Sequence, residues 1–276
     1  MNVIAREVLG SFEGTDIIKL VVSAPHIAKK AMPGQFVVLM VNEHGERIPL
    51  TIVDTDKAKG TVTIIFQVLG LTTGLLKGIK AGDSLYALVG PLGHATHITN
   101  YGKVILVGGG VGIAEIYPVA KALKNAGNNV TVIIGSRTKE LLILEKELKA
   151  EADNFYVTTD NGSYGRKAFT TDVLKELLSA GPYQLVYSVG PIPMMKRSAE
   201  VTKPFNVHTI VSLNAIMVDG TGMCGCCRVA VGGEVKFSCV DGPEFDAHKV
   251  DWDELIKRNR VYTDKEKHIC NLSKII

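Results

Sequence analysis

The sequence predicts a multidomain β plus α/β protein: an N-terminal antiparallel β-barrel, a central domain built on a parallel sheet, and a C-terminal loop domain organised by a metal site. Residues 1–99 hold short apolar runs separated by Gly, Pro and Asp, whereas in residues 100–205 strands alternate with helices. Residues 206–276 hold three of the five cysteines within four positions. A chain of 276 residues is also longer than one modest core usually organises.

The first unit, residues 1–99, is expected to form the barrel. Compact or alternating apolar runs of strand length, broken by turn residues at regular spacing, are typical of small antiparallel barrels. A single helix is expected inside it, over residues 72–80. The expected strands cover residues 8–14, 17–24, 35–41, 47–54, 61–70 and 83–93.

The second unit, residues 100–205, is expected to bind a nucleotide. Strands that alternate with helices of about ten or more residues indicate parallel βαβ units. The expected strands cover residues 103–110, 129–137, 154–162 and 183–191, and the expected helices cover residues 113–127, 139–152 and 170–181.

The third unit, residues 206–276, has too few apolar residues for a core of its own. It contains the cysteine cluster, paired glycines and a charged stretch over residues 251–268. We therefore expect its order to depend on a metal site and on docking onto the other two units.

Charge and hydropathy exclude several classes of protein. Lys and Arg number 31 and Asp and Glu number 28, so the net charge of +3 gives no electrostatic argument for a nucleic-acid partner. The apolar runs are of strand length, far short of the ~20 residues that span a bilayer. Arg6 and Glu7 interrupt the place where a signal peptide needs an apolar core. We expect a cytoplasmic protein without a membrane partner.

A glycine-rich turn, residues 108–112, follows an apolar strand and precedes an expected helix. Glycine permits a tight turn and lets backbone N–H groups approach a pyrophosphate, whose charge the helix N-terminus favours. The spacing GGGVG is not the full G-x-G-x-x-G fingerprint, so a plain βα turn with packing glycines stays open. The candidate dinucleotide contacts are Gly109, Gly110, Gly112 and Ile113.

The next strand ends at Ser136 and Arg137, where such folds meet the adenosine ribose. A carboxylate there would bind the 2′-hydroxyl of NAD, whereas Ser and Arg suit the 2′-phosphate of NADP. Residue chemistry alone therefore favours NADP, with Arg137 as a solvated surface residue the alternative.

The cysteine cluster forms the pattern D-x4-C-x2-C-x11-C, with Asp219, Cys224, Cys227 and Cys239 as candidate ligands. A plant-type 2Fe-2S site uses C-x4-C-x2-C and a distant fourth Cys. This chain keeps that spacing and has Asp in the first position, where a carboxylate can ligate ferric iron. Tetrahedral zinc is the rival reading, and Cys226 could replace one ligand.

With these three units in this order, the chain resembles the ferredoxin-NADP reductase superfamily. Within it the chain is similar to two families, the electron-transfer subunit of dihydroorotate dehydrogenase and the small subunit of NADH-dependent ferredoxin-NADP oxidoreductase, also described as the sulfide dehydrogenase β subunit. The resemblance covers essentially the whole chain. Its motifs are RIPLTI, GLTT, GPLG, GGGVG, TDNGSYG, VGPIPMM and the cysteine loop.

The resemblance implies an FAD bound by the first unit, with one motif at the isoalloxazine ring and two contacts to the pyrophosphate. By resemblance, Arg47 meets the pyrophosphate, Pro49, Leu50 and Thr51 line the ring, and Gly70, Thr72 and Thr73 make the second pyrophosphate contact.

The resemblance likewise implies a nicotinamide placed against the flavin by the turn at Gly190 and Pro191, with Asp160 as a further contact. Met194 is either a ligand contact or a core residue. No catalytic acid or nucleophile is expected, because hydride transfer is the chemistry of the cofactors.

The function implied is that of an FAD and 2Fe-2S electron-transfer subunit of an NAD(P)H:ferredoxin oxidoreductase complex of the electron-bifurcating transhydrogenase type. It would exchange a hydride between NAD(H) and FAD and pass single electrons to the cluster. The alternatives are the electron-transfer subunit of dihydroorotate dehydrogenase, whose family typically shows four Cys ligands, and a non-catalytic zinc or nucleotide-binding module.

On the choice of nucleotide, we follow the resemblance, which implies NAD(H), over the residue chemistry, which favours NADP(H). The resemblance also implies a larger partner subunit with flavin and iron-sulfur centres, forming a heterodimer that reaches ferredoxin through the complex. The glycine-rich surface around Met223 to Cys227 is the expected docking face.

Overall fold

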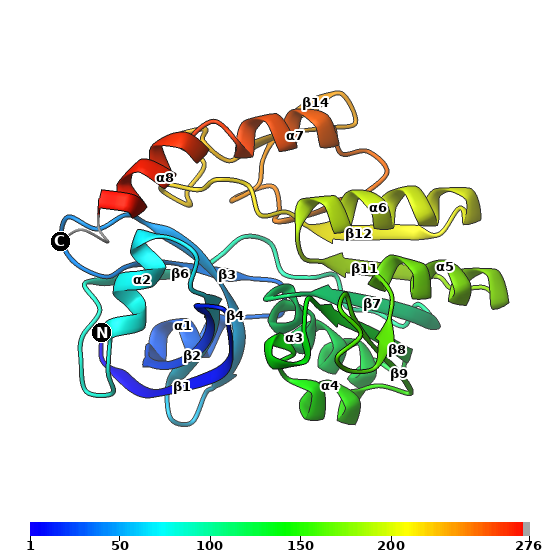
Figure 1. Cartoon of the computed structure of the whole chain (residues 1–276), viewed down its shortest axis with the longest axis horizontal. Helices are drawn as coiled ribbons and strands as arrows, with labels where there is room; N and C mark the ends of the chain where they lie inside the picture. Colours follow the sequence, from blue (N-terminus) through cyan, green and yellow to red (C-terminus); the bar gives the residue numbers. More distant parts are fainter. Residues whose placement is uncertain (273–276) are drawn as a thin grey trace.

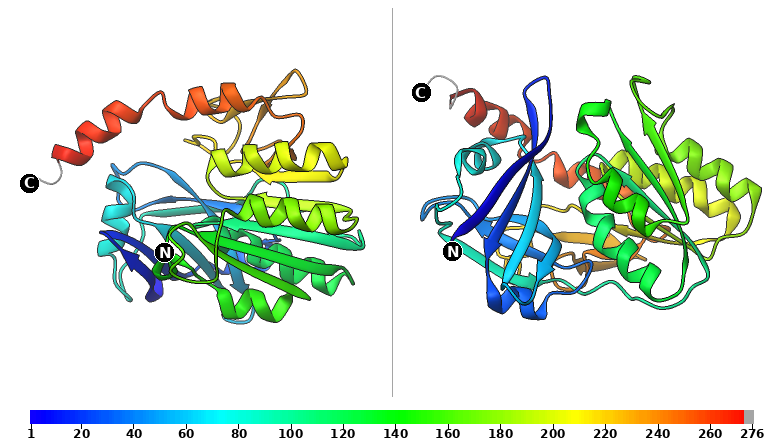
Figure 2. Two further views of the ribbon diagram at one scale, coloured as in Figure 1. Left: turned by 45° about the vertical axis from the view of Figure 1, so that its right-hand side comes forward. Right: turned by 90° about the horizontal axis from the view of Figure 1, so that it is seen from below.

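The structure, a computed structural model, describes the backbone of residues 1–272 and the side chains of these residues except Lys267 and residues 270–272. Two sheets lie next to each other, and the C-terminal segment crosses above both in Figure 1. Figure 2 shows the same arrangement from two other sides.

The N-terminal sheet is antiparallel, as expected. Its strands are β1 (Val3–Phe12), β2 (Thr15–Ser23), β3 (Phe36–Met40), β4 (Ile48–Asp56), β5 (Thr61–Gln67) and β6 (Ala87–Leu92), in the order β1-β2-β5-β4-β3-β6. A bridge between Asn2 and Ser84 joins the start of β1 to the segment before β6, so the two ends of the sheet meet. Ile18, Leu20 and Ile64 fill the interior without exposure to solvent.

Two helices accompany this sheet, α1 (Pro25–Lys30) and α2 (Leu71–Gly78). The second matches the helix expected over residues 72–80, whereas α1 was not expected. It spans only six residues, too few to show a helical period in the sequence. Pro25 at its first turn is a favourable helix start, and Ile27 is buried against the barrel.

The central sheet is parallel except at one edge. Its strands are β7 (Lys103–Gly109), β8 (Asn129–Ser136), β9 (Asn154–Thr159), β10 (Arg166–Lys167), β11 (Leu185–Val189), β12 (His208–Ser212) and β15 (Glu244–Asp246), in the order β10-β9-β8-β7-β11-β12-β15. Only β15 runs antiparallel to its neighbour. From β7 the chain moves first toward β8 and later to β11 on the other side. Ligands bind at the carboxyl ends of strands beside such a switch point.

The central sheet continues beyond residue 205, where we expected the second unit to end. Both β12 and β15 come from residues assigned to the third unit. In β12 the buried Thr209, Val211 and Ser212 continue the sheet beside β11. The C-terminal segment is thus built into the nucleotide sheet rather than only docked on it.

Helices cover both faces of the central sheet: α3 (Gly112–Asn125), α4 (Glu145–Glu151), α5 (Thr170–Ala180) and α6 (Ile192–Thr202). The helix expected over residues 139–152 is divided into a 3-10 turn, Lys139–Leu141, and α4. Leu141 and Ile143 are buried in the core between the two parts, and Leu144 has φ of 53°. The expected helix is therefore interrupted before α4, because the backbone turns to place the Leu141 and Ile143 side chains in the core.

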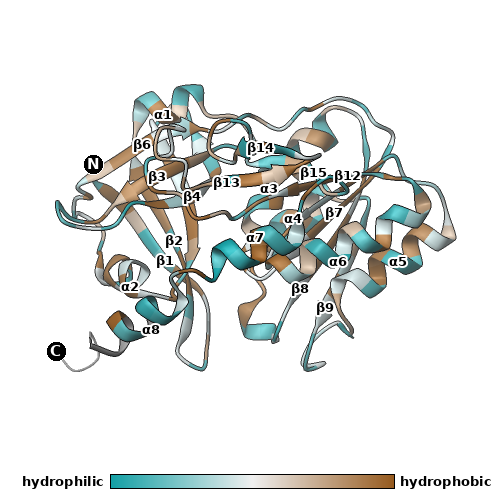
Figure 3. Cartoon of the chain, turned by 90° about the horizontal axis from the view of Figure 1, so that it is seen from above, coloured by the Kyte–Doolittle hydropathy of each residue, from teal (hydrophilic) through white to brown (hydrophobic). Residues whose placement is uncertain are grey.

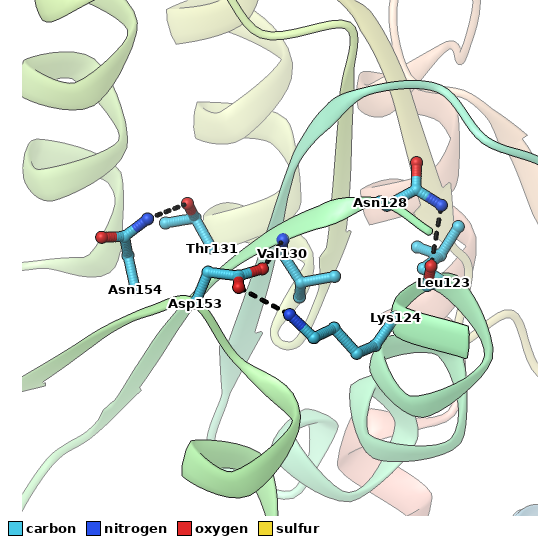
Figure 4. Close-up of polar contacts among 7 residues, drawn as sticks. All are labelled: Leu123, Lys124, Asn128, Val130, Thr131, Asp153 and Asn154. Atoms are coloured by element: carbon cyan, nitrogen blue, oxygen red, sulfur yellow. Dashed lines mark hydrogen bonds and ion pairs between the residues drawn. The ribbon is translucent and has the colours of Figure 1, made fainter. Parts of the chain in front are cut away.

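Polar contacts fix the amino ends of the central strands (Figure 4). Asp153, before β9, accepts hydrogen bonds from the Val130 backbone N–H of β8 at 2.8 Å and from Lys124 Nζ of α3 at 2.5 Å. The Lys124 hydrogen bond lowers the pKa of Asp153. Asn128 donates to the Leu123 carbonyl at 2.8 Å. These contacts hold the edge of the sheet that lies opposite the carboxyl ends.

The remaining C-terminal elements are β13 (Arg228–Val231), β14 (Glu234–Phe237), α7 (Trp252–Asn259) and α8 (Thr263–Leu272). Figure 3 shows α7 and α8 as largely hydrophilic, above strands that are largely hydrophobic. Val229 and Leu255 share one hydrophobic cluster with Phe36 of β3 and Met195 of α6. The expected docking onto both other units is therefore present. No helix in residues 1–272 combines the length and hydropathy needed to cross a bilayer.

Candidate functional site

Two cavities lie at the carboxyl ends of the central strands, where the barrel meets the central sheet. The inner cavity, of about 370 Å³, is enclosed by β4, the β7–α3 turn, the β11–α6 turn and residues 212–217. The outer cavity, of about 730 Å³, lies between the carboxyl ends of β8 and β9 and the starts of α5 and α6. The two share a wall made by Gln67, Leu69, Gly109, Gly110 and Pro191. Ligands in the two cavities would therefore lie against one another.

The RIPLT motif contributes directly to the inner cavity. Pro49, Leu50 and Thr51 line it from β4, but Arg47 is exposed and outside its wall. The Thr72 hydroxyl donates to the Glu46 carboxylate, which holds the loop carrying Arg47 beside the start of α2. The structure thus brings together the two segments expected at a pyrophosphate.

Gly70, Thr72 and Thr73 form the start of α2 and line neither cavity. The Thr73 hydroxyl accepts the N–H groups of Leu69 at 2.9 Å and Gly70 at 3.0 Å. This hydroxyl is therefore occupied in capping the helix. Leu69, not one of the predicted residues, is the member of this segment that reaches both cavities.

The glycine turn lies at the junction of the cavities. Gly110 has φ of 57° and donates its N–H to the Gly135 carbonyl at 2.9 Å. A Cβ on Gly112 would come within 2.6 Å of the Val189 carbonyl oxygen, so only glycine lets α3 start this close to β11. Ile113, by contrast, is fully buried in the core beneath the turn and lines neither cavity, contrary to expectation.

The residues expected at the adenosine ribose line the outer cavity. Ser136 donates its hydroxyl to the Thr138 carbonyl at 2.5 Å, so this donor is already occupied. Arg137 and Asp160 line the same region. Burial raises the pKa of Asp160, and the nearby positive charge of Arg137 acts in the opposite direction. The Asp160 carboxylate and the Arg137 guanidinium thus line the same part of the outer cavity, where we expected the adenosine ribose.

The β11–α6 turn supplies Pro191 to the wall that the two cavities share and Gly190 to the inner cavity alone, and Met194 follows on α6. A Cβ on Gly109 would lie 2.4 Å from the Met194 sulfur, so this thioether packs directly on the glycine turn. Met194 also lines the outer cavity and packs against the core around β7. Met194 therefore packs in the core and also lines a cavity, so the two roles that the sequence analysis left open for it do not exclude each other.

The sequence analysis missed Glu115, which lies in the first turn of α3 and lines the inner cavity. Thr51 donates its hydroxyl to Glu115 Oε2 at 3.1 Å. Burial raises the pKa of Glu115 to about 7, although hydrogen bonds from Ser212 and Thr51 favour its charged form and the Glu244 charge disfavours it. The sequence signal that could have identified Glu115 is its position as the one carboxylate within the apolar run IAEIYPVA.

A second acid, Glu244 of β15, lies behind Glu115. Its Oε1 accepts hydrogen bonds from Tyr187 at 2.7 Å and from Thr96. Burial raises the pKa of Glu244 and, together with the Glu244 and Glu115 charges, raises that of Tyr187. No feature of the sequence pairs Glu244 with Glu115, because β15 lies far from α3 along the chain.

The predicted metal ligands lie on one loop and one following turn, as two pairs. Asp219 accepts the N–H groups of Thr221 and Cys224, each at 2.9 Å. The buried sulfurs of Cys227 and Cys239 are 3.2 Å apart. Within the described residues, no three His, Cys, Asp or Glu side chains gather into one metal-binding group. The structure therefore brings the four candidates into one loop region without joining them into a single ligand set.

The loop has the chemistry and backbone that an iron-sulfur cluster needs. Three thiols and one carboxylate are the soft and hard donors expected for this pattern. Gly220 has φ of 75°, and a Cβ there would lie 2.9 Å from Val38 and Leu92 side chains, so glycine lets the loop lie on the barrel. Cys226 lines a separate cavity near α7, and its carbonyl accepts a hydrogen bond from Arg258 at 3.2 Å. The residue types of Asp219, Cys224, Cys227 and Cys239 suit a 2Fe-2S cluster, although within the described residues their side chains are not gathered into one ligand group.

Comparison with protein families identifies two parts of the chain. Residues 106–200 match the oxidoreductase NAD-binding domain. Residues 214–251 match the iron-sulfur cluster binding domain of dihydroorotate dehydrogenase B. The second match covers the loop that carries all four candidate ligands.

Comparison with individual proteins covers nearly the whole chain. A Thermotoga maritima protein described as a homolog of the dihydroorotate dehydrogenase B (NAD(+)) electron transfer subunit is 50% identical over 91% of this chain and 89% of its own. The electron transfer subunit of that enzyme from Geobacillus thermodenitrificans is 35% identical over 84% of this chain and 91% of its own. A chain from a structure of NADH-dependent reduced ferredoxin-NADP oxidoreductase, studied for flavin-based electron bifurcation, superposes with a TM-score of 0.93 at 46% identity. That superposition covers 100% of this chain and 98% of the other.

Proposed function

Since this chain belongs to the family of dihydroorotate dehydrogenase B electron transfer subunits and their homologs, we propose that it carries FAD and a 2Fe-2S cluster within an NAD(P)H:ferredoxin oxidoreductase complex. When bound, these cofactors would supply hydride exchange with NAD(H) and one-electron transfer to the cluster. The protein supplies binding, alignment and exclusion of water.

One observation carries this proposal: the inner and outer cavities share a wall at the switch point of the central sheet. Hydride transfer requires two rings in contact, and contact between ligands in the two cavities would satisfy this need. Gly109 and Gly110 add no side chain of their own to the shared region. The positions of Pro191 and Leu69 limit the region on the other sides.

In this proposal the isoalloxazine ring lies in the inner cavity against Pro49, Leu50 and Thr51. The pyrophosphate lies between Arg47 and the start of α2, which the Thr72–Glu46 hydrogen bond holds together. Arg47 supplies positive charge there, and the first N–H groups of α2 supply further donors.

The nicotinamide nucleotide occupies the outer cavity. Ser136, Arg137 and Asp160 line its ribose end, and Pro191 and Met194 line its nicotinamide end. Gly190 lines the adjoining inner cavity and packs against Met194. We propose NAD(H), because the relatives are described as NAD(+)- and NADH-dependent. In this chain the Asp160 carboxylate lines the outer cavity beside Arg137, and the Ser136 hydroxyl is already bonded to Thr138.

The cluster loop is packed against the inner cavity. Phe36, Ala215 and Met217 line this cavity and belong to the same hydrophobic cluster as Cys227 and Cys239. A cluster held by the loop would therefore be separated from the ring only by packed side chains. This short route supports transfer of single electrons out of the flavin.

A second candidate is the electron-transfer subunit of dihydroorotate dehydrogenase, favoured by the match of residues 214–251. Sequence identity does not separate the two candidates, since the Thermotoga maritima homolog of this subunit is 50% identical and the reductase chain 46% identical. We prefer the ferredoxin-linked reductase because Asp219 takes the position that a first Cys ligand would occupy.

The assembly we propose is a heterodimer with a larger subunit that bears further flavin and iron-sulfur centres and passes electrons to ferredoxin. A loop with cysteines at 224, 226, 227 and 239 that holds an iron-sulfur cluster suits a reducing compartment such as the cytoplasm.

The visible spectrum of the purified chain, with iron and sulfide analysis, tests the proposed function. We expect bound FAD, two irons per chain and bleaching of the flavin absorption by NADH. A colourless protein that contains zinc would refute the proposal. Rapid reduction by NADH only in the presence of dihydroorotate dehydrogenase would favour the second candidate.

A further inference from the structure

Glu115 is the one titratable side chain in the wall of the inner cavity, among the residues that the structure describes. It extends from the first turn of α3, directly after the glycine turn. Its Oε2 accepts the Thr51 hydroxyl at 3.1 Å, and Thr51 belongs to the motif that we place along the flavin ring. The carboxyl group is thus one hydrogen bond from the ring position.

The surroundings of Glu115 contain no positive charge to balance it. The described wall of the inner cavity contains no Lys, Arg or His. The groups that face Glu115 from the packed strands are Thr51 of β4, Ser212 of β12, Tyr187 of β11 and Glu244 of β15. Three of these are neutral, and the fourth is a second acid. Negative charge added to this cavity therefore meets no cationic side chain in the described wall, whose other polar side chains are hydroxyls and the amides of Gln67 and Asn214.

We propose that Glu115 is the proton-holding residue of the flavin cavity, which takes up a proton when the ring becomes electron-rich and releases it on reoxidation. This inference rests on the proposed function, in that the inner cavity holds the flavin ring. Glu115 acts as a positioning residue through the Thr51 hydroxyl. The raised pKa of Glu115, about 7, agrees with a group that changes protonation near neutral pH.

With both cofactors bound, NADH would give one hydride, which is two electrons and one proton, to FAD and would leave as NAD⁺. The ring would then carry one additional negative charge. The Glu115 carboxylate takes one proton from solvent, so the net charge of ring plus residue remains unchanged. Reoxidation in two single-electron steps through the cluster would release two protons to solvent, the one held by Glu115 and the one that reached the ring with the hydride.

The test is the number of protons taken up when the flavin of the purified, cofactor-loaded protein is reduced by two electrons. Between pH 7 and pH 9, the wild type should take up as much as one proton more than Glu115→Gln. The two-electron midpoint potential should then fall more steeply with pH in the wild type. One extra proton per two electrons is a tenfold change in equilibrium constant per pH unit, or about 30 mV.

Ser212→Ala and Glu147→Gln complete the design. The Ser212 hydrogen bond favours the charged form of Glu115, so its loss should move the extra proton uptake to higher pH. Ser212→Ala also keeps the inference testable if Glu115→Gln fails to fold. Glu147 is an exposed acid on α4, and Glu147→Gln should leave both the proton uptake and the potential slope unchanged.

Infrared difference spectra of reduced minus oxidised protein give a second readout. We expect a protonated carboxyl band that Glu115→Gln removes. Equal proton uptake by the wild type and Glu115→Gln, with FAD bound in both, would overturn this inference and leave the proposed function intact. A wild-type protein that binds no FAD would overturn both.

Discussion

Asp219 is the single residue on which the identity of the cluster depends most. In the structure both of its carboxylate oxygens accept loop N–H groups, and these bonds lower its pKa, with Thr221 the largest cause. A carboxylate is a harder ligand than a thiolate. We therefore expect Asp219→Cys to retain a 2Fe-2S cluster with a changed reduction potential and a changed electron paramagnetic resonance signal.

Cys226 supplies the comparison for that experiment. It lies next to Cys227 but lines a different cavity, so Cys226→Ser should leave the cluster spectrum unchanged. If Asp219→Cys left the signal and potential as in the wild type, and Cys226→Ser changed both, then Cys226 would be the fourth ligand.

Asp160 is the residue that should decide the nucleotide preference. Its carboxylate lines the ribose end of the outer cavity beside Arg137. Asp160→Asn removes negative charge and should raise the preference for NADPH over NADH about five- to tenfold, the effect of about 1 kcal/mol for one partly exposed charge. Flavin reduction rates with each nucleotide measure this ratio. A wild type that already prefers NADPH would show that Arg137 dominates.

Glu115 should also make the stability of the protein depend on pH. Its pKa rises from 4.5 to about 7 on folding, so the native state binds more protons than the unfolded state between these values. The free energy of unfolding therefore falls as pH rises from about 4.5 to 7, by roughly 3 kcal/mol. Glu115→Gln should be more stable than the wild type at pH 8, and this advantage should vanish at pH 5. Urea titrations at both values test this, with Glu147→Gln as the control.

At the level of elements, the β7–α3 turn depends on glycine for its position. An alanine Cβ at residue 112 would approach the Val189 carbonyl oxygen to 2.6 Å, which is backbone that cannot move aside without shifting β11. We expect Gly112→Ala to cost about 1–3 kcal/mol in the free energy of unfolding and to weaken NADH binding.

Gly181→Ala is the matched control, because Gly181 ends α5 in extended backbone with no atom near its Cβ position. Its stability should change by no more than about 0.5 kcal/mol. Equal stability and equal NADH affinity of both variants would contradict the assigned role of the turn.

The type of most elements followed from the sequence because their apolar periods were strong. The strands before and after the glycine turn, and the helix between them, lie within a few residues of expectation. The failures have local causes. The helix expected over residues 139–152 is broken because Leu141 and Ile143 enter the core, and β15 has only three residues.

The sequence indicated those parts of the candidate site that lie within one contiguous motif, and it did not indicate the contacts between segments that are distant along the chain. The motifs at residues 47–52 and 108–112 carry their own turn chemistry, and part of each reaches a cavity. The pairing of Glu115 with Thr51, and its proximity to Glu244, require one helix and two strands from three parts of the chain to meet. No spacing rule contains this information.

At the level of the whole molecule, the C-terminal segment joins the other two units. It adds β12 and β15 to the central sheet, lines the inner cavity with residues 213–217, and shares a hydrophobic cluster with β3. The inner cavity and the cysteine loop are therefore joined by one hydrophobic cluster that includes residues of β3, α6 and the C-terminal segment. This arrangement favours electron transfer without large movement of domains.

The cluster loop is also the place where electrons would leave this chain. Met223 at its tip is 88% exposed, and Val218 and Val240 nearby are also exposed. A large apolar side chain at the tip of a loop that carries Cys224 suits contact with a partner protein. We therefore place the docking face of the larger subunit on residues 218–227.

The last prediction is that the chain works only within a heteromeric complex. NADH delivers two electrons, and the sequence contains one cluster-binding set and one pair of flavin motifs; Cys270 stands alone. Further transfer toward ferredoxin therefore needs centres on another subunit.

Purification from the native source should give a complex larger than 29.7 kDa. Met223→Asp should release this chain from the complex with its flavin still bound, because the variant places a charge in an apolar contact. A Lys149→Asp variant on the exposed face of α4 should remain in the complex. A lone chain that couples NADH to ferredoxin at the full rate would refute the obligate complex.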